Sequence, residues 1–306
     1  MKTMFVTAAS ILALTSGALA ADLPVITKAP PPAPVASAWD IAFGGLIASD
    51  YNFRGVSQSD RGPSVGAYFE PRFNITPNVQ LYAGIGGYSV KLASDPAAEI
   101  DLYAGIRPTF GPLALDIGFL YYWYPRESQL FIDPTGTFLT TSPVGATGFW
   151  SLNDTDFWEI YGKATYTISD YVAVGGALYY AESWLNSGAD GTFASANIKF
   201  TAPAGFLPSD VGAYVSAEVG HYWLGTATAF APPFDVPDYL TWNAGIGFTY
   251  KVLTLDLRYY DTDLTPAECA LVGGDPAAFY NGGTSRWCDA TFIAKLSFDL
   301  TLASLR

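Results

Sequence analysis

Charged side chains recur at alternate positions inside stretches of the sequence that are otherwise apolar. In SDYNFRGVSQSDRGPSVGAYFEPRFN, from Ser49 to Asn74, the charged residues share one face and the aliphatic and aromatic residues share the other. Acids and bases mixed in this way can select ions in a channel or can pair with each other internally. The candidate pore-lining positions are Asp50, Arg54, Glu70, Arg72, Glu99, Asp101, Arg107, Asp116, Glu159, Lys163, Lys199, Glu218, Asp256, Arg258 and Lys295.

The sequence offers little for catalysis or for metal binding. His221 is the single histidine, and in EVGHYWL no serine lies within two residues of it on the same strand face. No run of the acidic loops matches a calcium-binding loop. We therefore expect no enzyme, no catalytic residue, no metal site and no cofactor, and a lipid-modifying enzyme is the least favoured alternative.

Cys269 and Cys288 are the two cysteines of the chain, and one long connection near the C-terminal end contains both. Two cysteines in one loop of an exported protein usually pair. A metal site would need third and fourth ligands, and no histidine lies nearby. The sequence therefore predicts a disulfide.

Strands must position the alternating charges, because a period of two places successive side chains on opposite faces of a sheet. The two flanks of the opening stretch and the later runs make twelve candidate strands. Most are close to the roughly 9 to 11 residues that a tilted strand needs to cross a bilayer. The later runs are VQLYAGIGGYSV, EIDLYAGIRPTF, LALDIGFLYYWY, FWEIYGKATYTI, VAVGGALYYAESW, TFASANIKFT, VGAYVSAEVGHYWL, LTWNAGIGFTY, LTLDLRYYDTD and ATFIAKLSFDL.

The connections between these runs alternate in length. Short links such as TPN, GP, SDY and KV follow every second strand, and most of the others are much longer. Short turns at one end, long loops at the other and an even strand number are typical of an outer-membrane barrel. The predicted fold is an all-β, closed, antiparallel transmembrane barrel of about 12 strands with both termini in the periplasm.

On the apolar faces of the predicted strands, the aromatic residues lie near the two strand ends. Two aromatic girdles with aliphatic residues between them are typical of a protein that crosses a membrane, where aromatic rings favour the two interfaces. Alternation alone would equally allow a soluble β-sandwich, but a sandwich has no reason to form such girdles. We therefore expect the apolar face outside and the charges inside a closed barrel, because an open edge in lipid leaves backbone groups unpaired. The loop-end girdle is Phe53, Trp123, Trp158, Trp223, Trp242 and Tyr259, and the turn-end girdle is Phe73, Phe110, Tyr166, Phe200, Phe248, Tyr250 and Phe298.

Glycines also occupy inward positions of the predicted strands, among them Gly84, Gly105 and Gly247. They either keep space open in the lumen or allow tyrosines such as Tyr82 and Tyr103 to pack over them. Alternation does not distinguish these two roles.

The N-terminal segment divides from the barrel by composition. Lys2, an apolar run and the small residues before Ala21 predict a cleavable signal peptide at residues 1–20. The proline-rich stretch within residues 21–38 predicts an extended periplasmic spacer, and the barrel is assigned to residues 39–306. A net charge of -13 with 15 Lys and Arg excludes a basic, nucleic-acid-binding surface.

The long loops are rich in Asp and Glu. They would make the mouth negative and favour cations, although solubility and bridging of divalent cations to surface lipid explain such loops comparably well. The loop from Leu130 to Trp150 is too apolar for a solvated excursion, and we expect it to fold over the mouth.

The string Asp50 to Gln58, within SDYNFRGVSQSDRGPSVGAYFEP, resembles the N-terminal signature of the TorF family of proteobacterial porin-like proteins. The strand and loop organisation is similar to that family over nearly all of the mature chain. This resemblance implies an outer-membrane barrel and a channel, and it implies no chemistry.

These patterns predict a bacterial outer-membrane porin-like channel for passive diffusion of small hydrophilic solutes or ions, with a preference for cations. The alternative is a non-conducting structural or adhesive barrel, in which the internal charges only pair with each other. The partners expected are outer-membrane lipid and lipopolysaccharide and small solutes or ions, with no nucleic acid and with homo-oligomerisation left open.

Overall fold

The computed structural model describes residues 38–132, 138–139, 151–208, 210–230 and 232–305, and two short segments that pair with each other, β1 (Ser10–Leu12) and β2 (Ile26–Lys28). The predicted signal peptide and spacer lie largely outside these residues. The same holds for most of the apolar loop from Leu130 to Trp150, so its predicted fold over the mouth stays a prediction.

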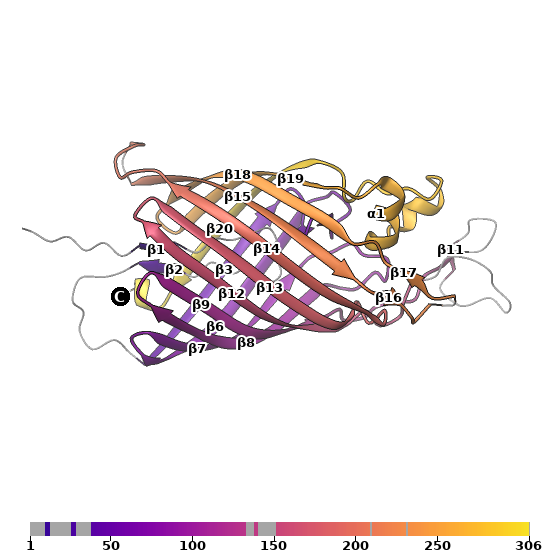
Figure 1. Ribbon diagram of the computed structural model, residues 1–306, viewed down its shortest axis with the longest axis horizontal. Coiled ribbons are helices and arrows are strands. Elements are labelled where there is room, and N and C mark those ends of the chain that lie inside the picture. The colour runs from indigo at the N-terminus through magenta and orange to yellow at the C-terminus, as the bar shows by residue number, and fades with distance from the viewer. Residues whose placement is uncertain are drawn as a thin grey trace, which may run out of the picture.

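Twelve antiparallel strands form a closed barrel (Figure 1). The first strand pairs with the last over Ala42–Ala48 and Lys295–Thr301, which leaves no open edge. Closure pairs the backbone groups of every wall strand, as a barrel in lipid requires. In chain order the wall strands are β3 (Trp39–Ala48), β6 (Ser64–Thr76), β7 (Val79–Tyr88), β8 (Glu99–Phe110), β9 (Leu113–Trp123), β12 (Phe157–Ser169), β13 (Val172–Trp184), β14 (Ala189–Thr201), β15 (Val211–Leu224), β18 (Tyr239–Tyr250), β19 (Leu253–Thr262) and β20 (Thr291–Thr301).

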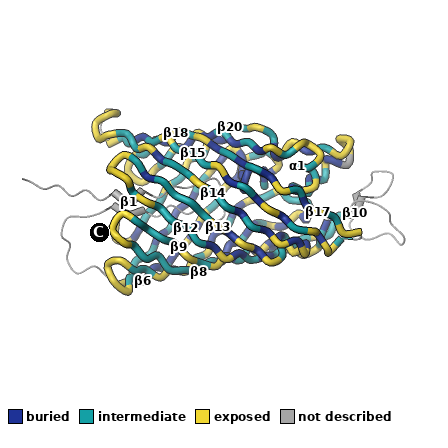
Figure 2. Tube along the Cα trace, viewed as in Figure 1, coloured by how far each residue is buried: buried dark blue, intermediate teal, exposed yellow. Residues whose placement is uncertain are grey.

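Exposure alternates along the wall strands, as Figure 2 shows. In β6 the side chains of Val65 and Phe69 are 54% and 46% exposed, whereas Glu70 is fully buried. The exposed face is apolar and the buried face carries the charges, so the apolar face is the outside, as predicted. A closed barrel with an apolar outer face is an outer-membrane β-barrel.

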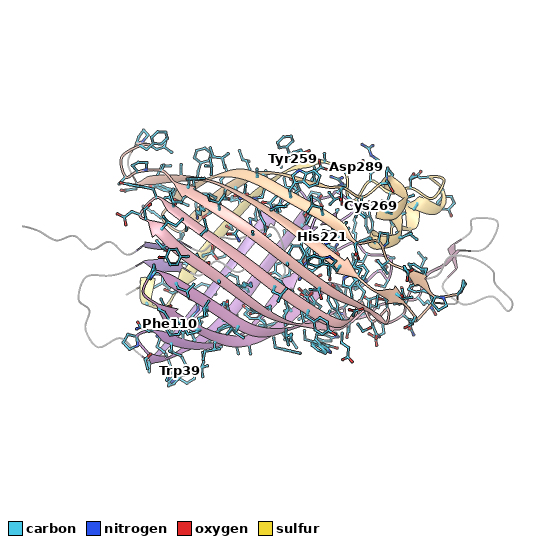
Figure 3. The ribbon with its side chains drawn as sticks, in the orientation of Figure 1. Trp39, Phe110, His221, Tyr259, Cys269 and Asp289 are labelled. Atoms are coloured by element: carbon cyan, nitrogen blue, oxygen red, sulfur yellow. A yellow bond between two sulfur atoms is a disulfide. The ribbon has the colours of Figure 1, made fainter. Side chains whose placement is uncertain are left out.

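Aromatic residues lie on the outer face at both ends of the barrel. Trp39 and Phe110 mark the end with the short turns in Figure 3, and Trp123 and Trp223 are exposed near the loop ends of their strands. The two girdles are therefore confirmed, with one exception. Phe53 belongs to neither girdle, because it lies inside the barrel.

The short turns and the C-terminal end lie at one end of the barrel and the long loops at the other (Figure 1). The short helix η2 (Ala303–Leu305), which follows the last strand, lies at the end with the short turns. The connection between β13 and β14 spans only residues 185–188, shorter than predicted, because β14 begins at Ala189, three residues before the expected run. The loops contain β10 (Phe131–Ile132), β11 (Phe138–Leu139), β16 (Thr226–Ala227), β17 (Phe234–Asp235), α1 (Pro266–Gly273) and η1 (Pro276–Phe279). Within the described residues, no helix is long and apolar enough to cross a membrane.

The connection between β3 and β6 folds back into the barrel as a small hairpin of β4 (Asn52–Phe53) and β5 (Val56–Ser57). Residues 50–59 are called the inner hairpin below. Its turn residues, Arg54 and Gly55, have φ of 49° and 91°, and the Asn52 side chain accepts a hydrogen bond of 2.9 Å from the Gly55 amide. Positive φ at both central residues suits a tight two-residue hairpin turn.

The inner hairpin corrects the sequence analysis at its opening stretch. The expected first strand included Tyr51 and Phe53 on the lipid face, but the wall strand is Trp39–Ala48 and Tyr51 is fully buried. The expectation was wrong because the hairpin keeps the period of two of a wall strand, and alternation carries no information about which sheet a strand joins.

Candidate functional site in the barrel interior

The tip of the inner hairpin makes an ion pair with the opposite wall. Arg54 donates two hydrogen bonds of 2.7 Å to the two carboxylate oxygens of Glu159 on β12, and both side chains are buried. Tyr122 donates a third hydrogen bond, of 3.0 Å, to Glu159. A bidentate pair of this kind fixes orientation as well as distance.

Aromatic rings surround the guanidinium of Arg54. Its central carbon lies 4.6 to 4.7 Å from the ring centroids of Phe53, Tyr179, Phe193 and Tyr222. The last three rings come from β13, β14 and β15. Cation–π contacts strengthen when water is excluded, so this aromatic box holds the hairpin tip against the wall.

Hydrogen bonds fasten the base of the inner hairpin. Asp50 accepts hydrogen bonds from the hydroxyl groups of Ser57, at 2.6 Å, and Ser59, at 2.9 Å. Burial raises the pKa of the Asp50 carboxyl, and these two hydrogen bonds oppose that rise. Tyr51 donates to Glu99 on β8, which also accepts from Tyr124 at 2.8 Å.

A network of wall charges lies nearer the short turns. Glu70 accepts hydrogen bonds from Arg72, at 2.5 Å, and from both terminal nitrogens of Arg107, at 2.7 and 3.1 Å. Arg107 also donates to Asp116 at 3.1 Å and covers the ring of Tyr82 at 3.6 Å. The charges on β6, β8 and β9 therefore satisfy each other without help from a loop.

A second network joins β15, β18 and β19 at a similar level. Arg258 donates to Asp256 at 2.9 Å, to Asn243 at 2.7 Å and to Ser216 at 2.8 Å. Asn243 in turn donates to Glu218 at 3.1 Å. Charge pairing thus continues on the opposite part of the wall.

The remaining predicted positions also face inward. The ammonium of Lys199 lies 4.0 Å from the ring centroid of Tyr214, and that of Lys163 lies 4.8 Å from that of Tyr161. Lys295 stands opposite Asp256 in the register of β19 and β20. Asp101 is fully buried, and among the described residues neither of its carboxylate oxygens has a hydrogen-bond partner.

Tyrosine rings pack directly on the inward glycines. A Cβ added to Gly84 would lie 2.3 Å from the ring of Tyr103, and one added to Gly247 would lie 2.0 Å from the ring of Tyr214. This resolves the two roles that alternation left open. At these positions glycine gives room to aromatic side chains that fill the lumen.

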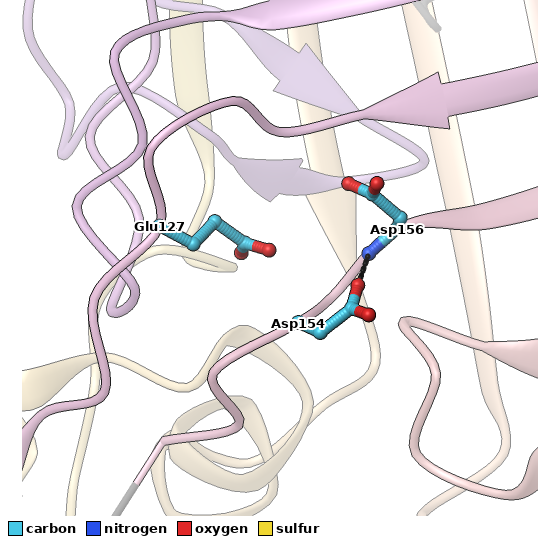
Figure 4. Close-up of side chains that lie close together, drawn as sticks. All are labelled: Glu127, Asp154 and Asp156. Atoms are coloured by element: carbon cyan, nitrogen blue, oxygen red, sulfur yellow. Dashed lines mark hydrogen bonds between the residues drawn. The ribbon is translucent and has the colours of Figure 1, made fainter.

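Three acidic residues of the connection between β9 and β12 converge (Figure 4). Carboxylate oxygens of Glu127, Asp154 and Asp156 all lie within 4.8 Å of one another. Each also accepts a hydrogen bond from the loops: Glu127 from the Thr155 amide at 2.8 Å, Asp156 from the Tyr124 amide at 2.7 Å, and Asp154 from the Asp156 amide at 3.2 Å. The cluster therefore orders the loop backbone.

The last long loop is cross-linked as predicted. Cys269 and Cys288 form a disulfide with their Cα atoms 5.8 Å apart, and it joins α1 to the segment before β20. His221 lies on the outer face, 4.4 Å from Trp223 between ring centroids, which is where alternation placed it.

Residues 32–139, which include the inner hairpin, match the family model described as a bacterial protein of unknown function, Gcw_chp. No curated protein is similar enough to match. Among solved structures, the KdgM porin in complex with disordered oligogalacturonate is 9% identical over 85% of this chain and 98% of its own, with a TM-score of 0.42. The NanC porin is 9% identical over 86% and 100%, also with a TM-score of 0.42.

LpxR from Salmonella typhimurium is 10% identical over 85% of this chain and 99% of its own, with a TM-score of 0.38. Similarities this distant do not transfer a function to this chain.

The aromatic box could not be predicted once the hairpin was assigned to the wall, because that assignment placed Phe53 on the lipid face. Tyr179, Phe193 and Tyr222 alternate with lipid-facing residues, so their inward direction was available. The signal that could have found the hairpin is the pair Arg54 and Gly55, preceded by Asn52, since glycine next to polar residues marks a tight turn.

Proposed function

We propose that this protein is an outer-membrane channel for small hydrophilic solutes or ions, and that the inner hairpin narrows its lumen. The observation that carries the proposal is the contact of Arg54 with Glu159, by which a loop reaches across the interior to the opposite wall. The resemblance to the TorF family and the long-loop and short-turn arrangement support this assignment, with the long loops outside the cell and both termini in the periplasm.

A preference for cations is the finer part of the proposal. Asp60 and Asp95 are exposed on the long loops and Asp190 is exposed at the loop end of β14, and the chain as a whole carries a net charge of -13. A negative mouth raises the local concentration of cations, and this effect falls as salt screens it. Replacing these three residues with Asn should move the reversal potential toward zero under a potassium chloride gradient.

Single-channel recording in a planar bilayer tests the channel. The decisive variant replaces residues 51–58 with a short Gly-Ser linker, and its control replaces the exposed residues 281–283 of the last loop in the same way. We expect larger unitary conductance from the hairpin variant and wild-type conductance from the control. Equal conductance in all three proteins would overturn the narrowing role of the hairpin.

The second candidate is a non-conducting structural barrel. It is favoured by the close pairing of interior charges, for example around Glu70 and Arg258, because buried charges are tolerated when they are paired. Absence of current from both the wild type and the hairpin variant would support this candidate and reject the channel.

We also propose that the barrel has no catalytic activity. Among the described residues Nδ1 of His221 has no hydrogen-bond partner, and the ring lies tilted against that of Trp223 in the loop-end girdle. Loss of a lipid-modifying activity on substitution of His221 would refute this.

A further inference from the structure

A cavity of about 330 Å³ lies between the inner hairpin and the long loops, and it is called the loop cavity below. Phe53 and Val56 of the hairpin line it together with Tyr222 and Tyr239 of the wall, and residues 270–274 of α1 and its C-terminal cap line another side. The cavity is therefore bounded by segments from the first loop to the last. Its volume falls at the lower end of the roughly 300 to 1,000 Å³ range of small-molecule sites.

Aromatic and aliphatic side chains form most of the lining. Phe157 and Trp184 contribute from the loop ends of β12 and β13, and Phe230 and Phe234 contribute a pair of rings 5.2 Å apart. No charged residue lines the cavity in the part of the chain that the structure describes. This contrasts with the acidic loop surface outside it.

The hydroxyl groups of the three lining serines already have partners within the loops, whereas the buried hydroxyl of Tyr222 has no hydrogen-bond partner among the described residues. Ser94 donates to Glu127 at 2.5 Å, and Ser187 donates to the Trp184 carbonyl at 2.6 Å. The hydroxyl of Ser151 accepts from the Leu130 amide at 2.9 Å. A hydrophilic solute in the cavity would lose its hydration and find few replacement hydrogen bonds, whereas an apolar solute would gain from leaving water.

The walls of the loop cavity are held by cross-links outside it. The disulfide and the capping box of Thr265 and Glu268 fix α1, and the Ser57 amide donates to the Trp287 carbonyl at 2.9 Å, which joins the last loop to the hairpin. A cavity with fixed walls binds without first ordering its own loops, which favours affinity.

We propose that the loop cavity binds a neutral, mainly apolar small molecule of about the size of a two- or three-ring aromatic compound. Rings such as those of Phe53, Phe234 and Trp184 suit an aromatic ligand, because aromatic pairs gain from edge-to-face and offset contacts. This inference goes beyond the channel, since binding in the cavity does not require passage through the barrel. The loop end of the protein would then bind an apolar ligand, whereas the proposed channel passes hydrophilic solutes.

Fluorescence titration of the protein in lipid nanodiscs tests the inference. The probe is N-phenyl-1-naphthylamine, which is neutral, with empty nanodiscs as the background. We expect saturable binding above that background, displacement by naphthalene, and binding at least tenfold weaker for 1-anilinonaphthalene-8-sulfonate, which has the same rings and a sulfonate. Signal equal to that of empty nanodiscs, or equal affinity for the two probes, would overturn the proposal.

Matched substitutions test whether the probe binds in the loop cavity. Ala93 lines the cavity and Ala97, four residues on in the same loop, is exposed and does not line it. We expect Ala93→Phe to weaken probe binding at least tenfold and Ala97→Phe to leave it unchanged.

A second pair, on the last loop, is Ala270→Phe in the cavity and Ala277→Phe on the exposed surface. It tests the same point if one loop variant fails to fold, which heat-modifiable mobility on gels would show. Unchanged affinity in a folded cavity variant would refute the site. Because no current is measured, failure here leaves the channel proposal standing.

Discussion

The two halves of the barrel interior satisfy their charges in different ways. In the half near the short turns, Glu70 is shared by Arg72 and Arg107, and all three belong to the wall. In the half near the long loops, Glu159 pairs with Arg54, which the inner hairpin brings across the lumen. The turn half is thus completed by register between neighbouring strands, and the loop half by a segment that folds back.

This difference sets how much each half depends on a single residue. A carboxylate with two arginines keeps a counterion when one is removed. A carboxylate whose arginine arrives on a hairpin loses both its counterion and the hairpin contact at once. A substitution that breaks the ion pair in the loop half should therefore lower the free energy of unfolding more than one in the turn half.

The largest effect should come from breaking the pair in the loop half. Glu159→Ala leaves Arg54 buried without its counterion, which costs about 3 to 5 kcal/mol when one partner of a buried pair is removed. We expect a matching fall in the free energy of unfolding in urea and release of the inner hairpin to protease.

The control for this prediction is Asp170→Ala, which removes an exposed carboxylate of the turn between β12 and β13. The double variant Arg54→Leu with Glu159→Leu should recover much of the lost stability, because it leaves no unpaired charge. A single variant as stable as the control would contradict the dependence of the loop half on this pair.

The comparison also requires that these charges lie inside. Val215→Arg and Ala164→Arg place a charge on the lipid face of mid-strand positions and should each cost about 2 to 4 kcal/mol, with poor assembly in membranes. Ser297→Arg, on the inward face of β20, is the control and should be milder. Harmless lipid-face variants would reverse the assignment of inside and outside.

Gly118 is an unsuitable inward control, although alternation places it in the lumen. A Cβ there would lie 2.6 Å from the ring of Tyr161 and 2.8 Å from the carbonyl oxygen of Ala104. Arginine at this position would disturb the wall itself.

A smaller effect is expected in the turn half. Arg72→Ala leaves Glu70 with its two hydrogen bonds from Arg107, so the loss should be about 1.5 to 3 kcal/mol, the usual range for a hydrogen bond to a charged group. Unfolding of Arg72→Ala and Glu159→Ala in urea under the same conditions compares the two losses in free energy directly. A loss from Arg72→Ala that equals or exceeds the loss from Glu159→Ala would erase the distinction between them.

The smallest effect on the barrel should come from reducing the disulfide. Closing a loop of this length restricts the unfolded chain by roughly 3 kcal/mol in the chain-entropy model, but the cross-link lies wholly within one loop. We expect reduction to leave the heat resistance of the barrel intact and to make the α1 segment sensitive to protease. Collapse of the barrel on reduction would show that the loop supports the wall.

The charge pairing in the turn half could be predicted from the sequence, because the period of two in the strands determines which side chains face inward. Once Glu70, Arg72 and Arg107 are placed on wall strands, alternation alone turns them inward, and a closed barrel brings them within reach of each other. The strand number, the outer girdles and the disulfide followed from the same kind of local signal.

The loop half could not be predicted in this way. The contact of Arg54 with Glu159 joins positions 105 residues apart, and it depends on a loop entering the lumen, which no local period encodes. The loop cavity depends on the same event, since Phe53 and Val56 form part of it only after the hairpin has turned inward.

The inner hairpin also has a mechanical consequence. It is rooted between β3 and β6, and the rings that hold its tip include those on β13 and β14. Around the barrel, β15, β18, β19 and β20 separate the two regions on one side, and β7, β8, β9 and β12 on the other. The hairpin therefore spans a diameter of the barrel. A cylinder of strands resists elongation through its hydrogen bonds but can flatten without breaking them, and a segment fixed to opposite walls opposes that flattening, so the barrel should keep a constant width under lateral pressure from the membrane.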